Sequence, residues 1–399
     1  GSGKTIVAVF TMLIAVENGY QAALMAPTEI LAEQHYLTTH RMLEALGVHV
    51  VLLIGGQTRQ VRQAVLSEIS EGCAHIIVGT HALIQESVEY RRLGLVIVDE
   101  QHRFGVLQRA QLREKGLNPD LLVMTATPIP RTLSMTVYGD LDVSILNELP
   151  ANRKPIRTFW RPQTGRAKIY EFVRRQMELG AQAYVVFPLV EETEKSDLKS
   201  AVDSYEKMKS GFFSAFEIGL LHGRMKTAEK EQVMDEFKSG RYRLLVSTTV
   251  IEVGVDVADA TLMVVEHAER FGLTQLHQLR GRVGRGEKQS YCILIAYGTL
   301  GAEAKRRLET LTETTDGFKI AEVDLELRGP GEFFGTRQHG LPELKLANVI
   351  EDTSLLLAAR DEAFKIAQED PQLRRAENGL LREYFIKHYR EKFESIWVG

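Results

Sequence analysis

The chain has 399 residues, of which 44% are hydrophobic and 26% are charged. These proportions are ordinary for a folded globular protein and exclude a disordered or collagen-like chain, and the length exceeds what one hydrophobic core usually holds. With 49 Lys and Arg against 53 Asp and Glu, the formal net charge is −4, so we expect any polyanion to bind at local basic patches rather than over the whole surface.

Neither the cysteines nor the apolar segments indicate a secreted or membrane protein. The two cysteines, Cys73 and Cys292, are far apart in the sequence, and no cluster of Cys and His surrounds either of them. This argues against a disulfide framework or a zinc site and for a reducing compartment. No stretch approaches the roughly 18 consecutive apolar residues that a membrane span needs. We therefore expect a cytoplasmic protein that does not contact a membrane.

From residue 20 to about residue 140, short apolar runs alternate with longer amphipathic stretches. The runs are nearly continuous in apolar residues, as strands are when helices cover both faces of a parallel sheet. This pattern predicts a doubly wound α/β lobe. Its expected strands are Ala22–Met25, Val48–Ile54, His75–Val78, Leu95–Val98 and Leu121–Met124, and its expected helices include Glu29–Leu46, Gln60–Ser70 and Val106–Glu114.

The segment Leu149–Pro155 has two prolines and no periodicity, which indicates a linker. After it the alternation resumes, so we expect a second α/β lobe that extends to about residue 300. No internal sequence repeat is evident, although the two lobes share an architecture. The expected strands of the second lobe are Ala183–Phe187, Ile218–Leu221, Leu244–Val246, Leu262–Val265 and Tyr291–Ile295.

Beyond residue 300 the pattern is helical. Ala302–Thr312 is expected to form a helix, and Arg328–Gly331, with two glycines and a proline, is expected to break the chain. Ser354–Gln368 and Gln372–Lys392 are expected to be the closing helices. The predicted fold is therefore α/β, with two tandem doubly wound parallel-sheet lobes and a mainly helical C-terminal element, divided as residues 1–150, 151–300 and 301–399.

The sequence opens on Gly1-Ser2-Gly3-Lys4-Thr5, followed by apolar, helix-forming residues. This looks like the second half of a phosphate-binding loop, in which glycines let backbone N–H groups close on phosphate oxygens. Lys4 would supply a cation to the outer phosphates, and the Thr5 hydroxyl would ligate Mg²⁺. The alternative is a Gly-Ser cloning scar, but a scar would not end in Lys-Thr and continue into a helix.

A second motif, Leu95–His102, is an apolar run that ends in the paired carboxylates Asp99 and Glu100. At the end of a buried parallel strand, one carboxylate can hold Mg²⁺ while its neighbour orients an attacking water. Taken alone, such a pair is more often a simple charge preference at a helix start. Its position after a Lys-Thr phosphate loop favours the catalytic interpretation.

Thr125-Ala126-Thr127-Pro128 follows another expected strand. Short hydroxyl side chains at a strand end can connect a nucleotide site to another lobe, and a simple turn before proline explains the segment equally well.

Two arginines occur three residues apart in Gln278–Gly286. If this segment is helical, Arg282 and Arg285 project from one face, and the small glycines permit close approach to another surface. This arrangement suits arginine fingers, which supply charge to a phosphoryl transition state when two lobes close. A solvated basic turn or a DNA backbone contact would explain the same residues, and the three preceding motifs favour the finger.

In chain order, these segments resemble the motifs of superfamily 2 helicases across both lobes, which implies RecA-like lobes that share one ATP site. The matching segments are the phosphate loop, Met25–Glu29, Gly79–His81, Asp99–His102, Thr125–Pro128, Ser247–Thr249 leading into Glu252–Asp256, and Gln278–Arg285.

Three further segments, Ala26–His35, Asp99–Gly105 and Arg328–Glu332 with Gly335–Gln338, resemble the bacterial RecG family. Its members are ATP-dependent DNA helicases that remodel branched DNA by fork reversal and Holliday junction branch migration in recombination and repair. The main alternative is a duplex-DNA translocase of the transcription-repair coupling type, which shares the segment after the motor and does not separate strands. That relative typically reads Asp-Glu-Glu-Gln at Asp99–His102, which favours RecG.

The resemblance implies ATP and Mg²⁺ as cofactors. It makes Glu100 the general base, while Arg282 and Arg285 complete the site from the second lobe and Asp256 senses the nucleotide. The implied catalytic residues are Glu100, Gln278, Arg282 and Arg285; the nucleotide-binding residues are Gly1, Ser2, Gly3, Lys4, Thr5, Asp99, Gly254 and Asp256; and the metal-binding residues are Thr5 and Asp99.

The resemblance also implies branched and duplex DNA as partner, recognised by structure rather than by base sequence. We expect a monomer, with single-strand binding protein as a candidate partner. The residues implied in DNA contact and translocation are Thr28, Thr80, His81, Thr248, Arg307, Arg337 and Gln338. Of these, Arg307 and Gln338 belong to the motif that turns lobe closure into movement on duplex DNA.

The sequence departs from the family at its front. The family has an N-terminal wedge domain with an oligonucleotide-binding fold, and the first strand and opening glycine of the phosphate loop, and none of these is in this sequence. We therefore expect a fragment that begins inside the loop. Two more functions stay open: an inactive DNA-binding module, which the presence of Lys4, Asp99, Glu100 and Arg285 disfavours, and an RNA helicase, which only the family-specific segments disfavour.

Overall fold

The computed structural model describes residues 2–100, 111–112, 114–125, 142–146, 148, 154–188, 194–248, 257, 259–333 and 352–397. The chain divides into a larger compact unit, which contains both sheets and ends at Leu327, and a smaller unit that contains the C-terminal helices. Among the described residues, no helix is both long and apolar enough to span a membrane.

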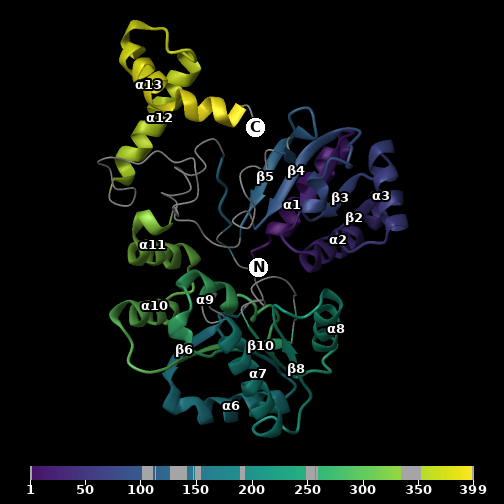
Figure 1. Ribbon diagram of the computed structural model, residues 1–399, viewed down its shortest axis with the longest axis vertical. Coiled ribbons are helices and arrows are strands. Elements are labelled where there is room, and N and C mark those ends of the chain that lie inside the picture. Colours follow the sequence, from purple (N-terminus) through teal and green to yellow (C-terminus); the bar gives the residue numbers. More distant parts are fainter. Residues whose placement is uncertain are drawn as a thin grey trace. The chain divides into compact units, whose positions relative to one another are not determined.

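The first lobe is built on a five-stranded parallel sheet with the order β2-β3-β1-β4-β5 (Figure 1). The central strand β1 is buried along its whole length, which explains why its apolar run is continuous rather than alternating. All five strands predicted from the sequence are confirmed. They are β1 Gln21–Met25, β2 Val50–Leu53, β3 Ile76–Gly79, β4 Leu93–Asp99 and β5 Asp120–Met124.

Helices cover both faces of this sheet. On one face, α1 (Lys4–Glu17) and α2 (Glu29–Leu43) bury apolar side chains against the strands, and α3 (Arg59–Glu71) does so on the other. A 3₁₀ turn, Glu44–Leu46, extends α2 to the predicted end. The predicted helix Val106–Glu114 falls mostly outside the described residues.

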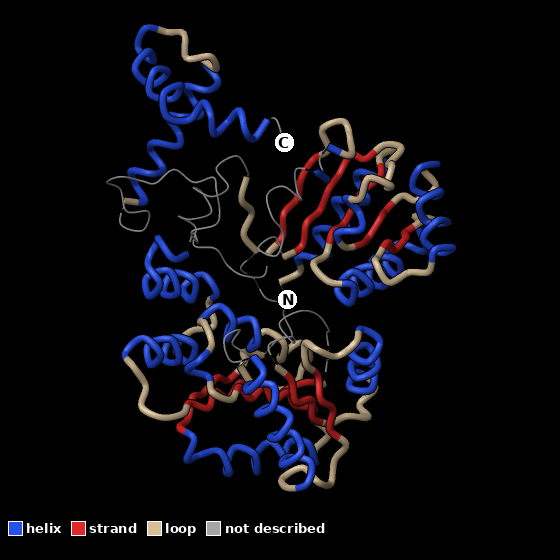
Figure 2. Tube along the Cα trace, in the orientation of Figure 1, coloured by secondary structure: helices blue, strands red, loops and turns tan. Residues whose placement is uncertain are grey.

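The second lobe contains a six-stranded parallel sheet with the order β6-β11-β10-β7-β9-β8 (Figure 2). Five of its strands were predicted, and the sixth, β6, was not. Alternate residues of β6 are exposed because it lies at the edge of the sheet, so it has no continuous apolar run. The strands are β6 Arg157–Pro162, β7 Gln182–Val186, β8 Ile218–Leu221, β9 Leu244–Ser247, β10 Ala260–Val265 and β11 Tyr291–Ala296.

This sheet is also covered on both faces. Apolar side chains of α6 and α7 fill one face, and those of α8, α9, α10 and α11 fill the other. The helices are α6 Arg166–Glu178, α7 Glu194–Ser210, α8 Thr227–Lys238, α9 Leu273–Arg280, α10 Ala302–Glu313 and α11 Gly317–Phe333.

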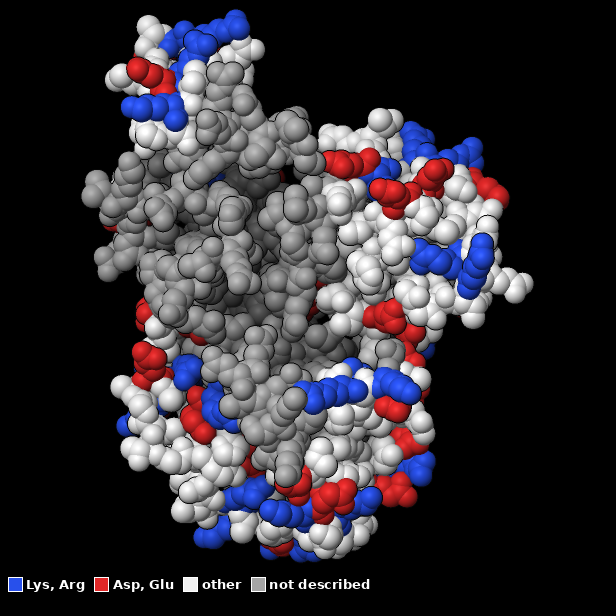
Figure 3. All heavy atoms as spheres, in the orientation of Figure 1, with Lys and Arg blue, Asp and Glu red and all other residues white. Residues whose placement is uncertain are grey.

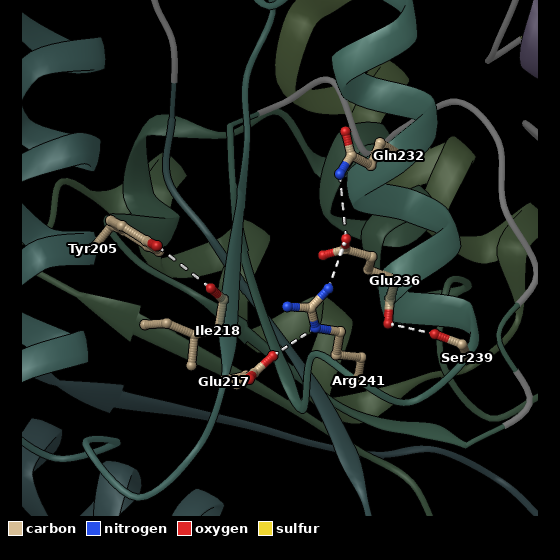
Figure 4. A network of polar contacts seen from close by, with 7 residues as sticks. All are labelled: Tyr205, Glu217, Ile218, Gln232, Glu236, Ser239 and Arg241. Atoms are coloured by element: carbon tan, nitrogen blue, oxygen red, sulfur yellow. Dashed lines mark hydrogen bonds and ion pairs between the residues drawn. The ribbon is translucent and has the colours of Figure 1, made fainter.

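An exposed polar network lies where α8 turns back into the sheet (Figure 4). Arg241 donates to Glu217, just before β8, at 2.8 Å, and to Glu236 on α8 at 3.0 Å. These carboxylates raise the pKa of the guanidinium, through the hydrogen bond to Glu217 first. Solvent screens exposed ion pairs, so they add little to stability. Arg241 therefore offers a matched control for substitutions at the arginines discussed below.

The two lobes repeat one topology. Read from β8, the second sheet has the strand order of the first, with β6 added at the far edge. The register matches as well, since Met25 pairs with Val98 and Val186 pairs with Val265, and each pairing skips one residue near the start of the strands. Asp99 and Glu266, which follow these pairs directly, therefore occupy equivalent positions.

A pair of glutamines shows that the equivalence extends to side chains. The side-chain amide of Gln21, at the start of β1, donates to the carbonyls of Ile69, in the last turn of α3, and Ala74, between α3 and β3. The amide of Gln182, at the start of β7, donates to the corresponding carbonyls of Phe237, in the last turn of α8, and Tyr242, before β9. The sequence therefore does hold a short internal repeat, Gly-x-Gln-Ala, at residues 19–22 and 180–183.

The C-terminal helices are α12 Thr353–Glu369 and α13 Gly379–Trp397. The expected helix from Gln372 begins seven residues late. The Asp370 carboxylate accepts backbone N–H bonds from Arg374 and Arg375 and a side-chain bond from Asn378, all within 2.8–2.9 Å, and these bonds hold the intervening residues in a turn.

The predicted break at Arg328–Gly331 is also wrong, because α11 continues through these residues to Phe333. Extending an existing helix costs far less than starting one, and the first part of α11 is anchored by buried residues such as Ile320 and Leu325. The predicted fold class, two tandem doubly wound lobes with a mainly helical C-terminal element, is confirmed.

Candidate active site

The chemistry-bearing residues of the first lobe gather at the edge of the sheet where its parallel strands end, called the carboxyl edge here. Helix α1 leads from Glu17 into β1 at Gln21 and packs on β1 and β4, so its first residues lie at this edge. Asp99, Thr28 and Thr80 follow or end β4, β1 and β3. Parallel α/β sheets bind ligands at this edge.

The start of α1 has the backbone of an anion site. Its N-cap, Gly3, has φ 95° and ψ 14°, a left-handed conformation that favours glycine. No side chain caps the helix, and its first turn contains no acidic residue. Helix N-termini carry partial positive charge and unpaired N–H groups. Ser2, Lys4 and Thr5 are partly exposed beside this end, as a phosphate site requires.

Asp99 ends β4 and is only 9% exposed. Its Oδ2 atom lies 2.8 Å from Nε2 of His35 on α2, which is 7% exposed, and its Oδ1 atom accepts the backbone N–H of Glu100 at 3.0 Å. Glu100 itself has φ 51°, in the left-handed region. The sequence assigned no role to His35, and only its position in the family-specific segment Ala26–His35 could have indicated one.

These residues fit Mg²⁺. Each Asp99 oxygen accepts one described hydrogen bond, and a carboxylate oxygen can accept two. No group of three or more His, Cys, Asp or Glu among the described residues could hold a metal. Mg²⁺ is usually bound through one or two carboxylates together with phosphate oxygens and water, so a single carboxylate beside a phosphate site suffices.

The predicted DNA-contacting residues differ in their accessibility. Thr28 is partly exposed and caps α2, accepting the N–H of Leu31 at 3.4 Å, and His81 is exposed. Thr80 and Thr248 are 2% and 0% exposed, and neither hydroxyl has a partner among the described residues. They follow the equivalent strands β3 and β9. In this conformation, their hydroxyls are not presented to solvent.

Five predicted site residues, Gly1, Gly254, Asp256, Arg337 and Gln338, lie outside the described residues, as do 126–128 of the threonine motif.

The two arginines predicted to be fingers do not lie on a helix, so the shared helix face is wrong, while their role stays a prediction. Helix α9 ends at Arg280, and Arg282 and Arg285 lie in the turn that follows it. Gly284 ends any helical continuation with φ 74°, and a Cβ there would lie 2.7 Å from Ile156. Gln278 lies on α9.

Arg282 and Arg285 lie within electrostatic reach of the central strand β7. Burial raises the pKa of Tyr184 on that strand, and the charges of Arg282 and Arg285 oppose this rise.

Arg280, the last residue of α9, is buried at 3% exposure and connects α9 to the end of α10. Its guanidinium donates to the carbonyls of Leu311 at 3.0 Å and Thr314 at 2.8 Å, and to Nδ1 of His277 at 3.0 Å. Burial, followed by the charge of Arg280, lowers the pKa of His277 to about 4, so its imidazole is neutral and accepts at Nδ1. The sequence assigned no role to Arg280, although it directly precedes the segment of Arg282 and Arg285.

Two more side chains connect α9 and the turn before it to the helical hairpin α10–α11. Arg307 on α10 donates to the carbonyls of Phe271 and Glu269 at 3.0 and 3.2 Å. Thr274 on α9 donates to the buried Asp324 on α11 at 2.8 Å. Hydrogen bonds therefore connect the segment of the predicted fingers to the hairpin α10–α11, which precedes Arg337 and Gln338 in the sequence.

We predict that Arg280→Met lowers the free energy of unfolding by about 3 kcal/mol, because it leaves buried carbonyls without a charged donor. Urea denaturation of the variant and of wild type measures the loss. Arg241→Met, which removes an exposed arginine, is the control and should cost much less, because solvent screens its ion pairs. Equal losses for the two variants would contradict the role of Arg280 as a buried tie.

The second lobe has an internal ion pair at the positions that Lys4 and Asp99 occupy in the first lobe. Glu266, equivalent to Asp99, is fully buried and accepts from Arg166 at 2.8 Å, from Tyr297 at 2.7 Å and from Tyr170. Arg166 begins α6 after Gly165, as Lys4 begins α1 after Gly3. His267 has φ 51°, like Glu100, so this backbone conformation belongs to the fold rather than to catalysis alone.

The described surface carries both signs of charge. On the face shown in Figure 3, the Lys and Arg side chains of the second lobe lie among Asp and Glu side chains. This agrees with the net charge of −4 and places no broad basic patch on the described part of this face.

Comparison with known families gives three matches that follow one another along the chain. Residues 1–136 match the DEAD/DEAH box helicase family, residues 166–287 match the helicase conserved C-terminal domain, and residues 314–395 match the C-terminal part of domain 3 of the ATP-dependent DNA helicase RecG.

Curated RecG helicases are similar to nearly the whole of this chain. The RecG helicase of a Synechocystis strain is 53% identical over 94% of this chain and 45% of its own length. That of Bacillus subtilis is 49% identical over 97% of this chain and 57% of its own length. The chain thus spans about half the length of the curated relatives it matches.

Among solved structures, RecG bound to a three-way DNA junction is 49% identical, with a TM-score of 0.72, over 89% of this chain and 46% of its own. Dbp5 of Saccharomyces cerevisiae bound to RNA and ADP BeF3 is 17% identical with a TM-score of 0.59 over 82% of this chain and 86% of its own, a similarity that shows the fold alone.

Proposed function

The chain belongs to the RecG family of ATP-dependent DNA helicases, and from this premise we propose that it couples ATP hydrolysis to movement on duplex DNA and to the remodelling of branched DNA. One observation carries the proposal: both helicase-family matches are followed by a match to the RecG-specific domain. The gathering of Lys4, Asp99 and Glu100 at one carboxyl edge supports it.

In the proposed mechanism, the N–H groups at the start of α1 and the Lys4 ammonium bind the ATP phosphates. Mg²⁺, held by Thr5 and Asp99, would neutralise phosphate charge. Glu100, next to Asp99, accepts a proton from the attacking water. Ser2 and Gly3, with Gly1, contribute backbone donors.

From the second lobe, Arg282 and Arg285 would stabilise charge on the transferred phosphoryl group, while Gln278, Gly254 and Asp256 complete nucleotide recognition. The contacts of Arg280 and Arg307 would pass a shift of this segment to the hairpin α10–α11. Arg337 and Gln338 would then act on duplex DNA. The division into residues 1–150, 151–300 and 301–399 is part of this proposal.

DNA would be held by Thr28, Thr80, His81 and Thr248 together with neighbouring backbone amides. Contacts to phosphates carry no sequence information, so binding should be directed by DNA structure and depend strongly on salt. We propose a monomer that acts in the cytoplasm, with single-strand binding protein as a candidate partner.

We predict that branched DNA stimulates ATP hydrolysis more than plain duplex DNA, and that RNA does not stimulate it. Fork substrates with labelled strands should be unwound or reversed. ATPase activity without strand separation would instead indicate a translocase of the transcription-repair coupling type, stimulation by RNA an RNA helicase, and absence of hydrolysis an inactive DNA-binding module.

Gln338→Ala separates the two parts of this activity. It should leave DNA-stimulated ATP hydrolysis largely intact while fork and junction processing fails. A parallel loss of both activities would mean that Gln338 has only a structural role.

A further inference from the structure

The carboxylate at the end of β4 is held by a residue that the sequence motifs leave without a role. His35 lies on α2, two helical turns after Thr28, and its Nε2 atom contacts Asp99 Oδ2 in a buried environment. An ionised carboxylate can only accept hydrogen bonds, so Nε2 is the donor. We propose that His35 is a positioning residue that orients Asp99 for Mg²⁺, an inference that rests on the proposed ATPase function.

Both Asp99 oxygens are fixed by different parts of the lobe. Oδ2 is bonded to a side chain on α2, and Oδ1 to the backbone N–H of Glu100, the proposed general base. Two bonds to two elements fix the rotation of the carboxylate, and each oxygen keeps a further acceptor position. Metal-binding carboxylates are commonly oriented by such hydrogen bonds, and losing one typically lowers metal affinity about 10- to 100-fold.

The second lobe shows what a different partner does at the same position. There Glu266 is neutralised by the guanidinium of Arg166 from the start of α6. In the first lobe, none of the described ion pairs joins Lys4, at the start of α1, to Asp99. An imidazole can donate a hydrogen bond without the permanent charge of a guanidinium. His35 therefore holds Asp99 without the permanent positive charge that Arg166 brings to Glu266.

The test measures the Mg²⁺ concentration that gives half-maximal binding of a fluorescent ADP. His35→Leu removes the donor and should raise this concentration about 10- to 100-fold, while His35→Gln, which retains a donor, should recover most of the loss. Binding of the same ADP in EDTA should not change, because Lys4 and the start of α1 are intact. His49→Leu is the matched control, since it removes an exposed His–Glu68 pair of 2.7 Å in the same lobe, and it should have no effect.

Thermal unfolding in EDTA reports folding independently of nucleotide. If His35→Leu does not fold, His35→Asn carries the test, since it keeps a polar group but shortens its reach, and it should also raise the Mg²⁺ requirement. An unchanged Mg²⁺ requirement in the folded variants, or an equal loss of ADP binding in EDTA, would overturn the positioning role alone. A wild-type protein that shows no Mg²⁺-dependent ADP binding would overturn the proposed function, and this inference with it.

Discussion

Replacing Glu100 with Gln is expected to abolish ATP turnover while leaving ATP binding intact. The amide cannot accept the proton of the attacking water, and the loss of a general base typically lowers a rate about 10²- to 10⁴-fold. Binding should persist because the phosphate contacts come from Lys4 and the start of α1, and because the N–H bond to Asp99 comes from the backbone of residue 100. Steady-state phosphate release and equilibrium ATP binding measure the two effects.

Asp120→Asn is the control for this experiment. Asp120 begins β5, at the opposite edge of the same sheet, and is exposed, so its neutralisation should change neither measurement. Near-normal hydrolysis by Glu100→Gln would remove Glu100 from the role of base. Weakened ATP binding in parallel with turnover would instead show that residue 100 supports the geometry of the β4 end.

Arg285→Ala is expected to slow hydrolysis about 10³-fold with little change in DNA affinity, because an arginine finger acts on the charge of the transition state. In this structure, Arg285 Nε donates to the Gly281 carbonyl at 3.3 Å, a long bond to a turn rather than a buried anchor. Single-turnover hydrolysis and DNA binding by fluorescence anisotropy separate the two effects.

Arg241→Ala provides the comparison, since it removes an exposed arginine with two carboxylate partners in the same lobe. Its hydrolysis rate should equal that of wild type. If Arg285→Ala weakens DNA binding and leaves the hydrolysis of bound ATP unchanged, the residue is a backbone contact of DNA and not a finger.

The comparison of the two lobes separates what the fold requires from what the proposed chemistry requires. Both lobes place an acidic residue at the end of the equivalent strands β4 and β10 and a left-handed residue directly after it. They differ in the partner of the acid, which is an imidazole in the first lobe and a guanidinium with two tyrosines in the second. Only the second arrangement pairs the acid with a permanently charged group.

The sequence by itself determined the two sheets. Ten of the eleven strands in the described part of the chain were predicted, because a strand buried on both faces must be apolar along its length, and this signal is local. The start of the first helix after Gly3 and the acidic pair Asp99 and Glu100 could be predicted for the same reason, because their signals are also local. Where exposure removed the signal, as in the edge strand β6, the prediction failed.

Only the tertiary structure decided which side chains meet. His35 and Asp99 are 64 residues apart, Arg166 and Glu266 are 100 apart, and Arg280 reaches carbonyls 31 and 34 residues later. Such pairs leave no periodicity in the sequence, because the contact depends on how helices pack against the sheet rather than on the pattern of neighbouring residues. Helix boundaries also escaped the sequence pattern: distant contacts of Arg280 accompany the end of α9, and the turn held by Asp370 delays the start of α13 to Gly379.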